Sequence, residues 1–161
     1  MKPDEIYDRY GEKMYHYLAL RLGSPQDAED VLQEAFCRLA RYSVRWAFVR
    51  SPKAFVFGVL RNEANRFLAK RARRRTEAIS DPGRWDRLTA VIDEPPDVPA
   101  VELARALGEL PDEQREVIVL KIFQDFSFRE IASVCEVSIN TASSRYRYGI
   151  EKLRASLEGK T

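Results

Sequence analysis

A block of carboxylates near the start of the chain is the first group of residues that could do chemistry. Asp27, Asp30 and Glu34 follow one another at steps of three and four residues, so on a helix they share one face. Such carboxylates can hold a metal ion for nuclease chemistry, or they can dock on a basic helix of a partner protein, where charge complementarity sets orientation and association rate. The candidates in this block are Asp27, Glu29, Asp30, Gln33 and Glu34.

The residues around the acidic block weigh against a metal site. Arg38 and Arg41 flank it, and the chain has one histidine, His16, so a His-containing metal site or a histidine-based catalytic triad is not expected. We expect no metal, no cofactor and no enzymatic activity. A solvated helix face, with Glu34 and Arg38 paired at four-residue spacing, is the interpretation that needs no partner.

A run of basic residues in the middle of the chain is the second candidate. Residues 61–75 carry seven Lys or Arg side chains and one acid, Glu63, which gives a local net charge of +6. A face that combines asparagine with arginine can contact phosphates and base edges, although a solvated helix end would have the same composition. Phe55 lies near the polar face, where its ring could stack on an unpaired base or pack against a neighbouring loop. The candidate nucleic-acid contacts are Arg61, Asn62, Asn65, Arg66, Lys70, Arg71, Arg73 and Arg74.

The last third of the chain contains a third candidate. Ser127 and Glu130 form an S-x-x-E capping box that predicts a short helix over 128–135, and after a turn Ser138 predicts a longer helix over about 139–157. This pattern indicates a helix-turn-helix, whose second helix enters the major groove by its N-terminal residues. A generic pair of helices would share the apolar stripe but would not need two caps at this spacing. The candidate contacts are Asn140, Thr141, Ser143, Ser144, Arg145 and Arg147, with Tyr148 beside them.

The helices that carry the acidic block and the basic run, and the helix before them, have start and stop signals in the sequence. Apolar residues at four-residue steps predict a helix over 3–22, and Gly23 is a plausible stop. Ser24 places a capping side chain ahead of Pro25 in the first helical turn, and Ser51 does the same ahead of Pro52. These signals predict helices over about 25–41 and from Ser51 to about residue 75.

A proline-rich stretch divides the helical parts. Between residues 76 and 99, Pro82, Pro95 and Pro96 are among the breakers that forbid a continuous helix. Beyond it, Pro111 at an N1-like position and the helix-turn-helix predict a second helical segment over about 100–158. We therefore predict an all-α protein of two small helical domains, residues 1–75 and 101–161, joined by a flexible linker, residues 76–100.

Length and composition set further limits. The 161 residues are 45% hydrophobic and 32% charged with a net charge of +2, which is typical of a globular protein, and no apolar run approaches the ~18 residues that span a bilayer. The first residues lack the apolar stretch of a secretory signal. Cys37 and Cys135 form no Cys-x-x-Cys motif, which excludes a disulfide scaffold and fits a reducing compartment. Both are predicted to be small buried apolar residues.

Three stretches of the chain carry a family resemblance. They are residues 27–41, DAEDVLQEAFCRLAR, residues 51–75, SPKAFVFGVLRNEANRFLAKRARRR, and residues 110–154, LPDEQREVIVLKIFQDFSFREIASVCEVSINTASSRYRYGIEKLR. In this order they resemble a bacterial RNA polymerase sigma factor of the extracytoplasmic-function type, in which region two and region four are joined by a linker. The resemblance covers nearly the whole chain outside residues 76–100.

The resemblance implies a role in transcription initiation. It implies that the acidic block docks on the clamp helices of core RNA polymerase, that the basic helix recognises the minus-ten element and holds the melted strand, and that the helix-turn-helix reads the minus-thirty-five element. It also implies a cytoplasmic monomer without membrane insertion, whose partners are core RNA polymerase, promoter DNA and an anti-sigma factor. The alternative is a stand-alone helix-turn-helix regulator, although such proteins are usually dimers and the chain has no dimerisation heptads.

Five positions depart from the family pattern: Arg66, Asp125, Glu136, Ala142 and Ser143. Asp125 and Glu136 stand where glycine is usual. A non-glycine residue in the left-handed region costs about 1 kcal/mol or more. We therefore expect the turn of the helix-turn-helix to be shifted.

Overall fold

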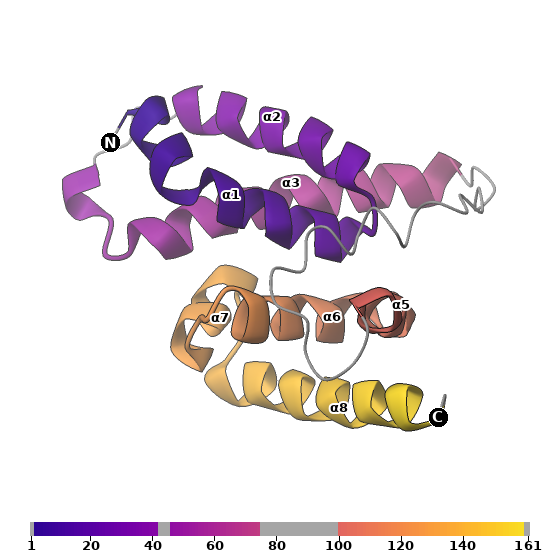
Figure 1. Ribbon diagram of the computed structural model, residues 1–161. Helices are drawn as coiled ribbons and strands as arrows, with labels where there is room; N and C mark the ends of the chain where they lie inside the picture. Colours follow the sequence, from indigo (N-terminus) through magenta and orange to yellow (C-terminus); the bar gives the residue numbers. More distant parts are fainter. Residues whose placement is uncertain (1, 42–45, 75–99, 160–161) are drawn as a thin grey trace.

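The computed structural model describes residues 2–41, 46–74 and 100–159. Regular structure within these ranges is helical throughout, which confirms the predicted all-α fold (Figure 1). The predicted linker lies almost entirely outside the described residues. No helix in these ranges has both the length and the apolar character needed to cross a bilayer. The elements are α1 (Pro3–Leu22), α2 (Pro25–Arg41), η1 (Trp46–Phe48), α3 (Pro52–Arg74), α5 (Ala100–Glu109), α6 (Asp112–Ile118), η2 (Val119–Phe123), α7 (Phe128–Cys135) and α8 (Ile139–Glu158).

The N-terminal bundle consists of α1, α2 and α3, and each of these helices packs on the other two (Figure 1). Its helix ends follow the predicted signals. Gly23 ends α1 with φ 73° in the left-handed region. The Ser24 hydroxyl accepts a hydrogen bond of 3.3 Å from the Asp27 N–H, and the Ser51 hydroxyl accepts one of 3.2 Å from the Ala54 N–H. The shared apolar core includes Leu18, Ala28, Val31, Phe57 and Leu60.

The C-terminal bundle consists of α5, α6, η2, α7 and α8. The predicted capping box opens α7, because the Ser127 hydroxyl accepts from the Glu130 N–H at 3.1 Å and the Glu130 carboxylate accepts from the Ser127 N–H at 2.9 Å. This backbone hydrogen bond lowers the pKa of the Glu130 carboxyl. Ser138 caps α8 by accepting from the Thr141 N–H at 3.0 Å. The predicted helix-turn-helix is therefore formed by α7 and α8.

Two local features differ from the expectation. Pro111 precedes α6 as its N-cap residue instead of occupying the first helical position. After α6 the chain widens into a π-helical segment, η2, in which the Gln124 N–H donates to the Val119 carbonyl at 3.1 Å. Apolar periodicity does not separate such a wider turn from an α-helix, so no sequence pattern indicated the π-helical segment.

The turn of the helix-turn-helix lies between Cys135, the last residue of α7, and Ile139, the first residue of α8. Glu136 adopts φ 56° and ψ 45° and ends α7 in the left-handed region, with its N–H donated to the Ala132 carbonyl. Asp125 also has φ 56°. The expectation of a shifted turn is wrong, because the two serine caps fix the helix starts and the chain accepts the left-handed strain at Glu136.

Replacing Glu136 by glycine should remove this strain. We expect Glu136→Gly to raise the free energy of unfolding by about 1 kcal/mol, since glycine adopts positive φ without a Cβ clash. Chemical denaturation followed by circular dichroism measures it. Glu136→Ala is the matched control, because it removes the same charge but keeps the Cβ atom. Equal stabilisation by both variants would contradict the strain argument.

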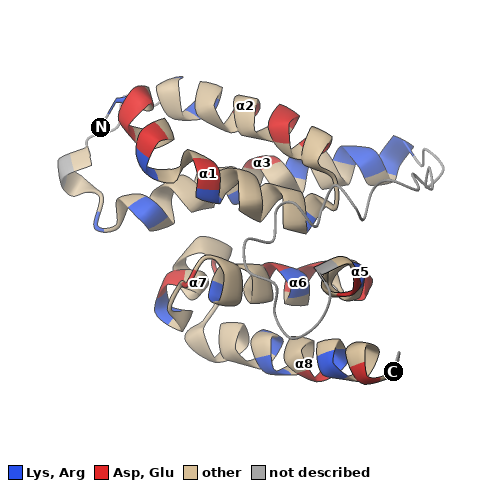
Figure 2. Ribbon diagram, viewed as in Figure 1, with Lys and Arg blue, Asp and Glu red and all other residues tan. Residues whose placement is uncertain are grey.

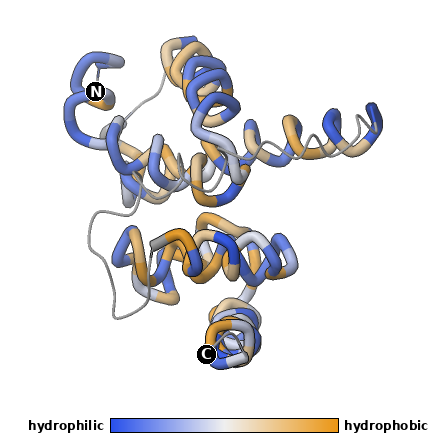
Figure 3. Tube along the Cα trace, turned by 45° about the vertical axis from the view of Figure 1, so that its right-hand side comes forward, coloured by the Kyte–Doolittle hydropathy of each residue, from blue (hydrophilic) through white to orange (hydrophobic). Residues whose placement is uncertain are grey.

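The two bundles pack directly on each other. Helices α6 and α7 lie against α1 and α3, as Figure 1 shows. The Phe57 and Phe126 rings meet edge to face with centroids 4.9 Å apart, and the Lys53 ammonium lies over the Phe126 ring while pairing with Glu130 at 3.3 Å. The C-terminal end of α3 projects beyond both bundles and is largely hydrophilic (Figure 3).

Candidate nucleic-acid and protein interfaces

The acidic block lies on the outer face of α2. Its inner face is buried at Ala28, Val31, Ala35 and Leu39, which turns the candidate residues Glu29, Asp30, Gln33 and Glu34 to solvent. Asp27 is half-buried and pairs with Arg71 of α3 at 3.7 Å. The solvated-face interpretation pairs Arg38 with Glu34. In the structure Arg38 pairs with buried Glu63 of α3. Three exposed carboxylates therefore remain on one outer surface.

No metal cluster accompanies these carboxylates. Within residues 2–41, 46–74 and 100–159, no group of three or more His, Cys, Asp or Glu side chains is arranged to hold a metal ion. Figure 2 shows acidic residues on α2 and a concentration of basic residues at the C-terminal end of α3.

The basic face of α3 divides into two parts. Its exposed part runs along the projecting end of the helix, where blue segments dominate Figure 2. Arg61 and Asn65 are half-buried and do not belong to it, because Arg61 donates to Glu116 of the C-terminal bundle and Asn65 accepts from Arg21 of α1. Phe55 packs edge to face on Trp46 of η1 with centroids 5.5 Å apart, which favours the loop-packing interpretation over base stacking. The exposed candidates are Asn62, Arg66, Lys70, Arg71, Arg73 and Arg74.

A hollow of about 180 Å³ joins the acidic and basic faces. Asp30 and Glu34 of α2 line it together with Arg66 and Lys70 of α3. The structure therefore brings together residues that sequence analysis assigned to two different partners.

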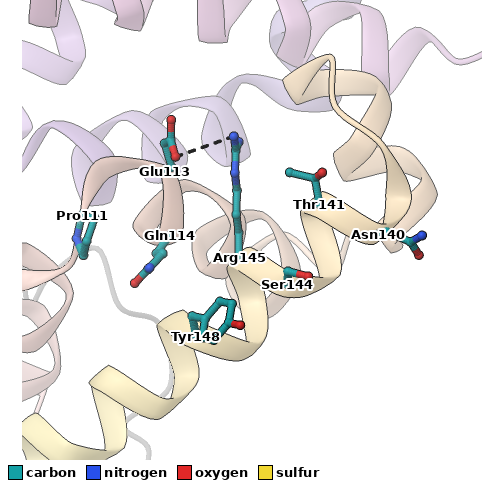
Figure 4. Close-up of a pocket in the computed structure, with 8 residues that line it drawn as sticks. All are labelled: Pro111, Glu113, Gln114, Asn140, Thr141, Ser144, Arg145 and Tyr148. Atoms are coloured by element: carbon teal, nitrogen blue, oxygen red, sulfur yellow. Dashed lines mark ion pairs between the residues drawn. The ribbon is translucent and has the colours of Figure 1, made fainter.

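The first turns of α8 form the third candidate surface. A pocket of about 330 Å³ opens there, and four predicted contacts line it: Asn140, Thr141, Ser144 and Arg145 (Figure 4). In Figure 4 the Arg145 side chain extends toward Glu113 of α6, with which it forms an ion pair at 3.6 Å. Of the two other candidates, Ser143 is half-buried and Arg147 is exposed, with its guanidinium 5.5 Å from the centroid of the Tyr148 ring.

Sequence analysis missed part of this pocket. Glu113 and Gln114 come from α6 and Pro111 from its N-cap, outside the helix-turn-helix itself. Helix α6 reaches the pocket because it approaches α8 closely at Gly149, where an added Cβ atom would meet Ile118 at 2.6 Å. A glycine inside a long helix was the one signal of this close approach.

An ionic cluster buried between the two bundles was also missed. We define it as Tyr17 and Arg21 of α1, Arg61 of α3, and Asp112 and Glu116 of α6. The Glu116 carboxylate accepts hydrogen bonds from Arg61 Nε at 2.6 Å and from the Tyr17 hydroxyl at 3.0 Å, and Arg21 Nη1 lies 3.8 Å away. Arg21 also pairs with Asp112 at 3.0 Å. Two of its members, Arg21 and Glu116, are each only 1% exposed, so they depend on one another for charge compensation.

The electrostatics of the cluster follow from its burial. Desolvation and the Glu116 carboxylate raise the pKa of Tyr17 well above its usual value, which keeps the phenol protonated as a donor. Burial lowers the pKa of Arg61 and of Arg21, but Tyr17 and the acids of α6 outweigh it and raise both pKa values. Arg21 and Arg61 therefore stay charged at all ordinary pH values.

The two cysteines differ in environment. Cys135 is buried beside the cluster, as predicted, and desolvation followed by the charge of Glu116 raises the pKa of its thiol to about 12. Cys37 is exposed, so its predicted burial is wrong. It lies two residues beyond buried Ala35, a 200° rotation on a helix, which places it opposite the core.

Thiol alkylation should distinguish them. At pH 8 only about one Cys135 thiol in 10⁴ is ionised, so we expect iodoacetamide to modify Cys37 and to leave Cys135 intact. Mass spectrometry of the native chain then finds one added group, and denaturant exposes the second thiol. Two added groups on the native chain would contradict the assigned burial.

Family models match both bundles. Residues 6–74 match sigma-70 region 2, and residues 100–153 match sigma-70 region 4. The first match covers α2 and α3 with their acidic and basic faces, and the second covers the helix-turn-helix. A stand-alone helix-turn-helix regulator is not favoured, because it would not account for the region 2 match.

Curated relatives match nearly the whole chain. The ECF RNA polymerase sigma factor SigE of Mycolicibacterium smegmatis is 32% identical over 160 residues, which cover 94% of this chain. The chain spans 60% of the length of SigE. SigW of Bacillus subtilis, another ECF RNA polymerase sigma factor, is 27% identical over 167 residues, which cover 95% of this chain and 87% of SigW.

Solved structures share the fold. The sigma factor RpoE of Bartonella quintana, in complex with the anti-sigma factor NepR, superposes with a TM-score of 0.68 at 22% identity, covering 91% of this chain and 90% of RpoE. CnrH, in complex with the cytosolic domain of CnrY, gives a TM-score of 0.72 at 23% identity, covering 99% of this chain and 89% of CnrH. The chain belongs to the sigma-70 family and, within it, to the extracytoplasmic-function (ECF) sigma factors, which are transcription initiation factors.

Proposed function

We propose that this chain is a promoter-specificity subunit, which directs core RNA polymerase to two promoter elements and helps to melt the duplex. The observation that carries the proposal is the match of both bundles, in order, to sigma-70 regions 2 and 4. The proposed domain boundaries are residues 1–75 for the polymerase and minus-ten functions, 76–100 for the linker, and 101–161 for the minus-thirty-five function. The chain performs no covalent chemistry in this role.

The outer face of α2 is the proposed contact with core polymerase. Its exposed carboxylates, Glu29, Asp30 and Glu34, with the amide of Gln33, present a negative surface that a basic partner helix would complement. The buried apolar stripe on the opposite side anchors α2 to α1 and α3, so the face is held rigid. Asp27 contributes at the edge, where it already pairs with Arg71.

The projecting part of α3 is the proposed minus-ten contact. Melting requires unstacking of bases, which costs a few kcal/mol per base and must be offset by contacts to the exposed strand. Exposed arginines and Lys70 supply phosphate contacts, and Asn62 supplies an amide for base edges. Arg61 joins this surface when it is not engaged by Glu116 of α6, and Asn65 joins it when it is not engaged by Arg21 of α1.

The first turns of α8 are the proposed minus-thirty-five contact. Thr141, Ser144 and Arg145 line a pocket at the N-terminal end of the helix, which is the end that a recognition helix presents to the major groove. Arg145 would leave Glu113 to bind guanine, since an arginine makes a bidentate contact with that base.

An anti-sigma factor is the proposed regulator. The RpoE structure contains the anti-sigma factor NepR, and the fold of that sigma factor is shared by this chain. We place the chain in the cytoplasm as a free monomer, because core RNA polymerase and promoter DNA are its proposed partners there.

Co-elution on a sizing column tests the proposed function. Purified chain mixed with bacterial core RNA polymerase should elute as one complex, separated from excess free chain. The proposal fails if the chain elutes only at its own size while shifting duplex DNA without polymerase, because a stand-alone regulator would behave in that way.

A further inference from the structure

The pocket at the first turns of α8 contains one pair of opposite charges. Glu113 reaches it from α6 and Arg145 from α8, and Figure 4 shows the two charged groups side by side, with Arg145 Nη2 3.6 Å from the Glu113 carboxylate. The other side chains that line this pocket, in the part of the chain that the structure describes, are uncharged. A carboxylate here needs an explanation, because the phosphates of bound DNA repel it.

The packing of α6 against α8 fixes Glu113 beside the recognition helix. The two helices approach most closely at Gly149, where an added Cβ atom would meet Ile118 at 2.6 Å and Gln114 at 3.3 Å. Glu113 directly precedes Gln114 in α6. The Arg145 side chain is 23% exposed and the Glu113 side chain is 70% exposed, so the carboxylate is open to a ligand that enters the pocket.

The major-groove edge of a G·C pair complements these two charges. Guanine presents the acceptors N7 and O6, to which an arginine donates two hydrogen bonds, and cytosine presents the N4 amino group, which donates to a glutamate. O6 and N4 are hydrogen-bonded to each other across the pair at about 2.9 Å. The ion pair of Arg145 and Glu113 has a similar separation, 3.6 Å. A donor and an acceptor held side by side therefore match an acceptor and a donor held side by side.

Binding of Arg145 to guanine changes the surroundings of Glu113. When the guanidinium turns to the base, the carboxylate loses its ion-pair partner, and a desolvated charge without a partner is costly. Cytosine N4 supplies the missing hydrogen bond. A reversed C·G pair or an A·T pair instead places an acceptor, guanine O6 or thymine O4, against the carboxylate, and repulsion of this kind is a source of specificity.

We propose that Glu113 is a specificity-determining residue of the minus-thirty-five contact, which accepts a hydrogen bond from cytosine N4 while Arg145 binds the paired guanine. This inference rests on the proposed function, because it places the first turns of α8 against the minus-thirty-five element. The carboxylate weakens binding to every sequence by repelling phosphates, and the cytosine contact offsets this repulsion only at the matching pair. One G·C pair is thus read from two helices.

Glu113 also has a role that needs no DNA. As an acid in the first turn of α6, like Asp112, it stabilises the helix dipole. That role predicts an effect on the free energy of unfolding and none on the choice of base. Base preference therefore separates the two roles.

Selection from a random-sequence duplex pool measures base choice directly. The complex of core RNA polymerase with the full chain is mixed with the pool, and the bound duplexes are sequenced. We expect wild type to prefer G·C at one position of the upstream element, and Glu113→Ala to lower that preference about tenfold at that position alone. Glu151→Ala, at an exposed position further along α8, removes the same charge and should leave every preference unchanged.

A modified base tests the contact without a change in the protein. N4-methylcytosine still pairs with guanine, but it carries a methyl group where cytosine offers an N–H to the major groove. At the selected pair it should weaken binding by the wild-type complex about tenfold, and it should change binding by the Glu113→Ala complex less than about twofold. Fluorescence anisotropy with labelled duplex measures both affinities.

The outcomes separate the two claims. The proposal is overturned if wild type has no G·C preference in the upstream element, or if Glu113→Ala keeps the wild-type preference. Equal weakening of both complexes by N4-methylcytosine also overturns it, because the methyl group then acts on a group other than Glu113. Failure of the proposed function has a different signature, in which wild type and both variants fail to co-elute with core RNA polymerase.

Discussion

Reversing two charges on α2 should abolish binding to core RNA polymerase. We expect the double variant Asp30→Arg with Glu34→Arg to weaken the complex at least 100-fold, which corresponds to about 2.7 kcal/mol. Both side chains are exposed on the outer face, so the substitutions place two positive charges against a basic partner, and juxtaposed like charges cost several kcal/mol. Fluorescence anisotropy with labelled chain measures the dissociation constant.

A matched variant separates this contact from a change in net charge. Asp8 and Glu12 of α1 are exposed and four residues apart, as Asp30 and Glu34 are. Asp8→Arg with Glu12→Arg should bind within about twofold of wild type. Equal losses in the two double variants would contradict the assignment of the polymerase contact to α2.

Removing charge from the projecting end of α3 should weaken promoter binding by the polymerase complex. We expect the triple variant Arg66→Ala, Lys70→Ala and Arg73→Ala to reduce affinity about 100-fold and to flatten its salt dependence. Each phosphate contact contributes about 0.7 to the slope of log affinity against log salt for single strands and about 0.9 for duplex, so the slope should fall by about two to three. Titration at several salt concentrations measures it.

The control is a second triple variant, which has the same net charge as the α3 variant. Arg9, Lys13 and Lys152 are exposed on α1 and α8, away from α3. Their replacement by alanine should leave the salt slope within about half a unit of wild type. If this control and the α3 variant flatten the slope equally, the electrostatic contact belongs to the chain as a whole instead of to α3.

The helix starts could be predicted because their causes are local. The hydroxyl oxygen of each capping serine accepts a hydrogen bond from the backbone N–H three residues along the chain, at Ser24, Ser51, Ser127 and Ser138. That bond depends on a few neighbouring residues and on no distant part of the fold. The same holds for the apolar stripe of α2, which by itself turns the acidic block outward.

The engagement of Arg61 could not be predicted because its cause is distant. Its partner Glu116 lies 55 residues further along the chain, in the other bundle. The helical pattern correctly placed Arg61 off the apolar face of α3, but it carries no information about which second element covers that polar face. The approach of α6 to the α8 pocket could not be predicted for the same reason, because it depends on the tertiary contact at Gly149.

Cys37 illustrates a different error. The prediction followed residue type, since free cysteines are usually buried, although the periodicity of α2 already pointed Cys37 away from Ala35 and Leu39. Position on the helix outweighed the preference of the residue type. Cys135 shows the reverse case, in which type and position agree.

Promoter-directed transcription tests the central claim most directly. Core RNA polymerase, with and without the chain, is given a pool of random-sequence duplex templates, and the transcript start sites are sequenced. The account predicts starts that depend on the chain and share two upstream sequence elements, one near minus ten and one near minus thirty-five. Start sites that are the same with and without the chain would contradict it.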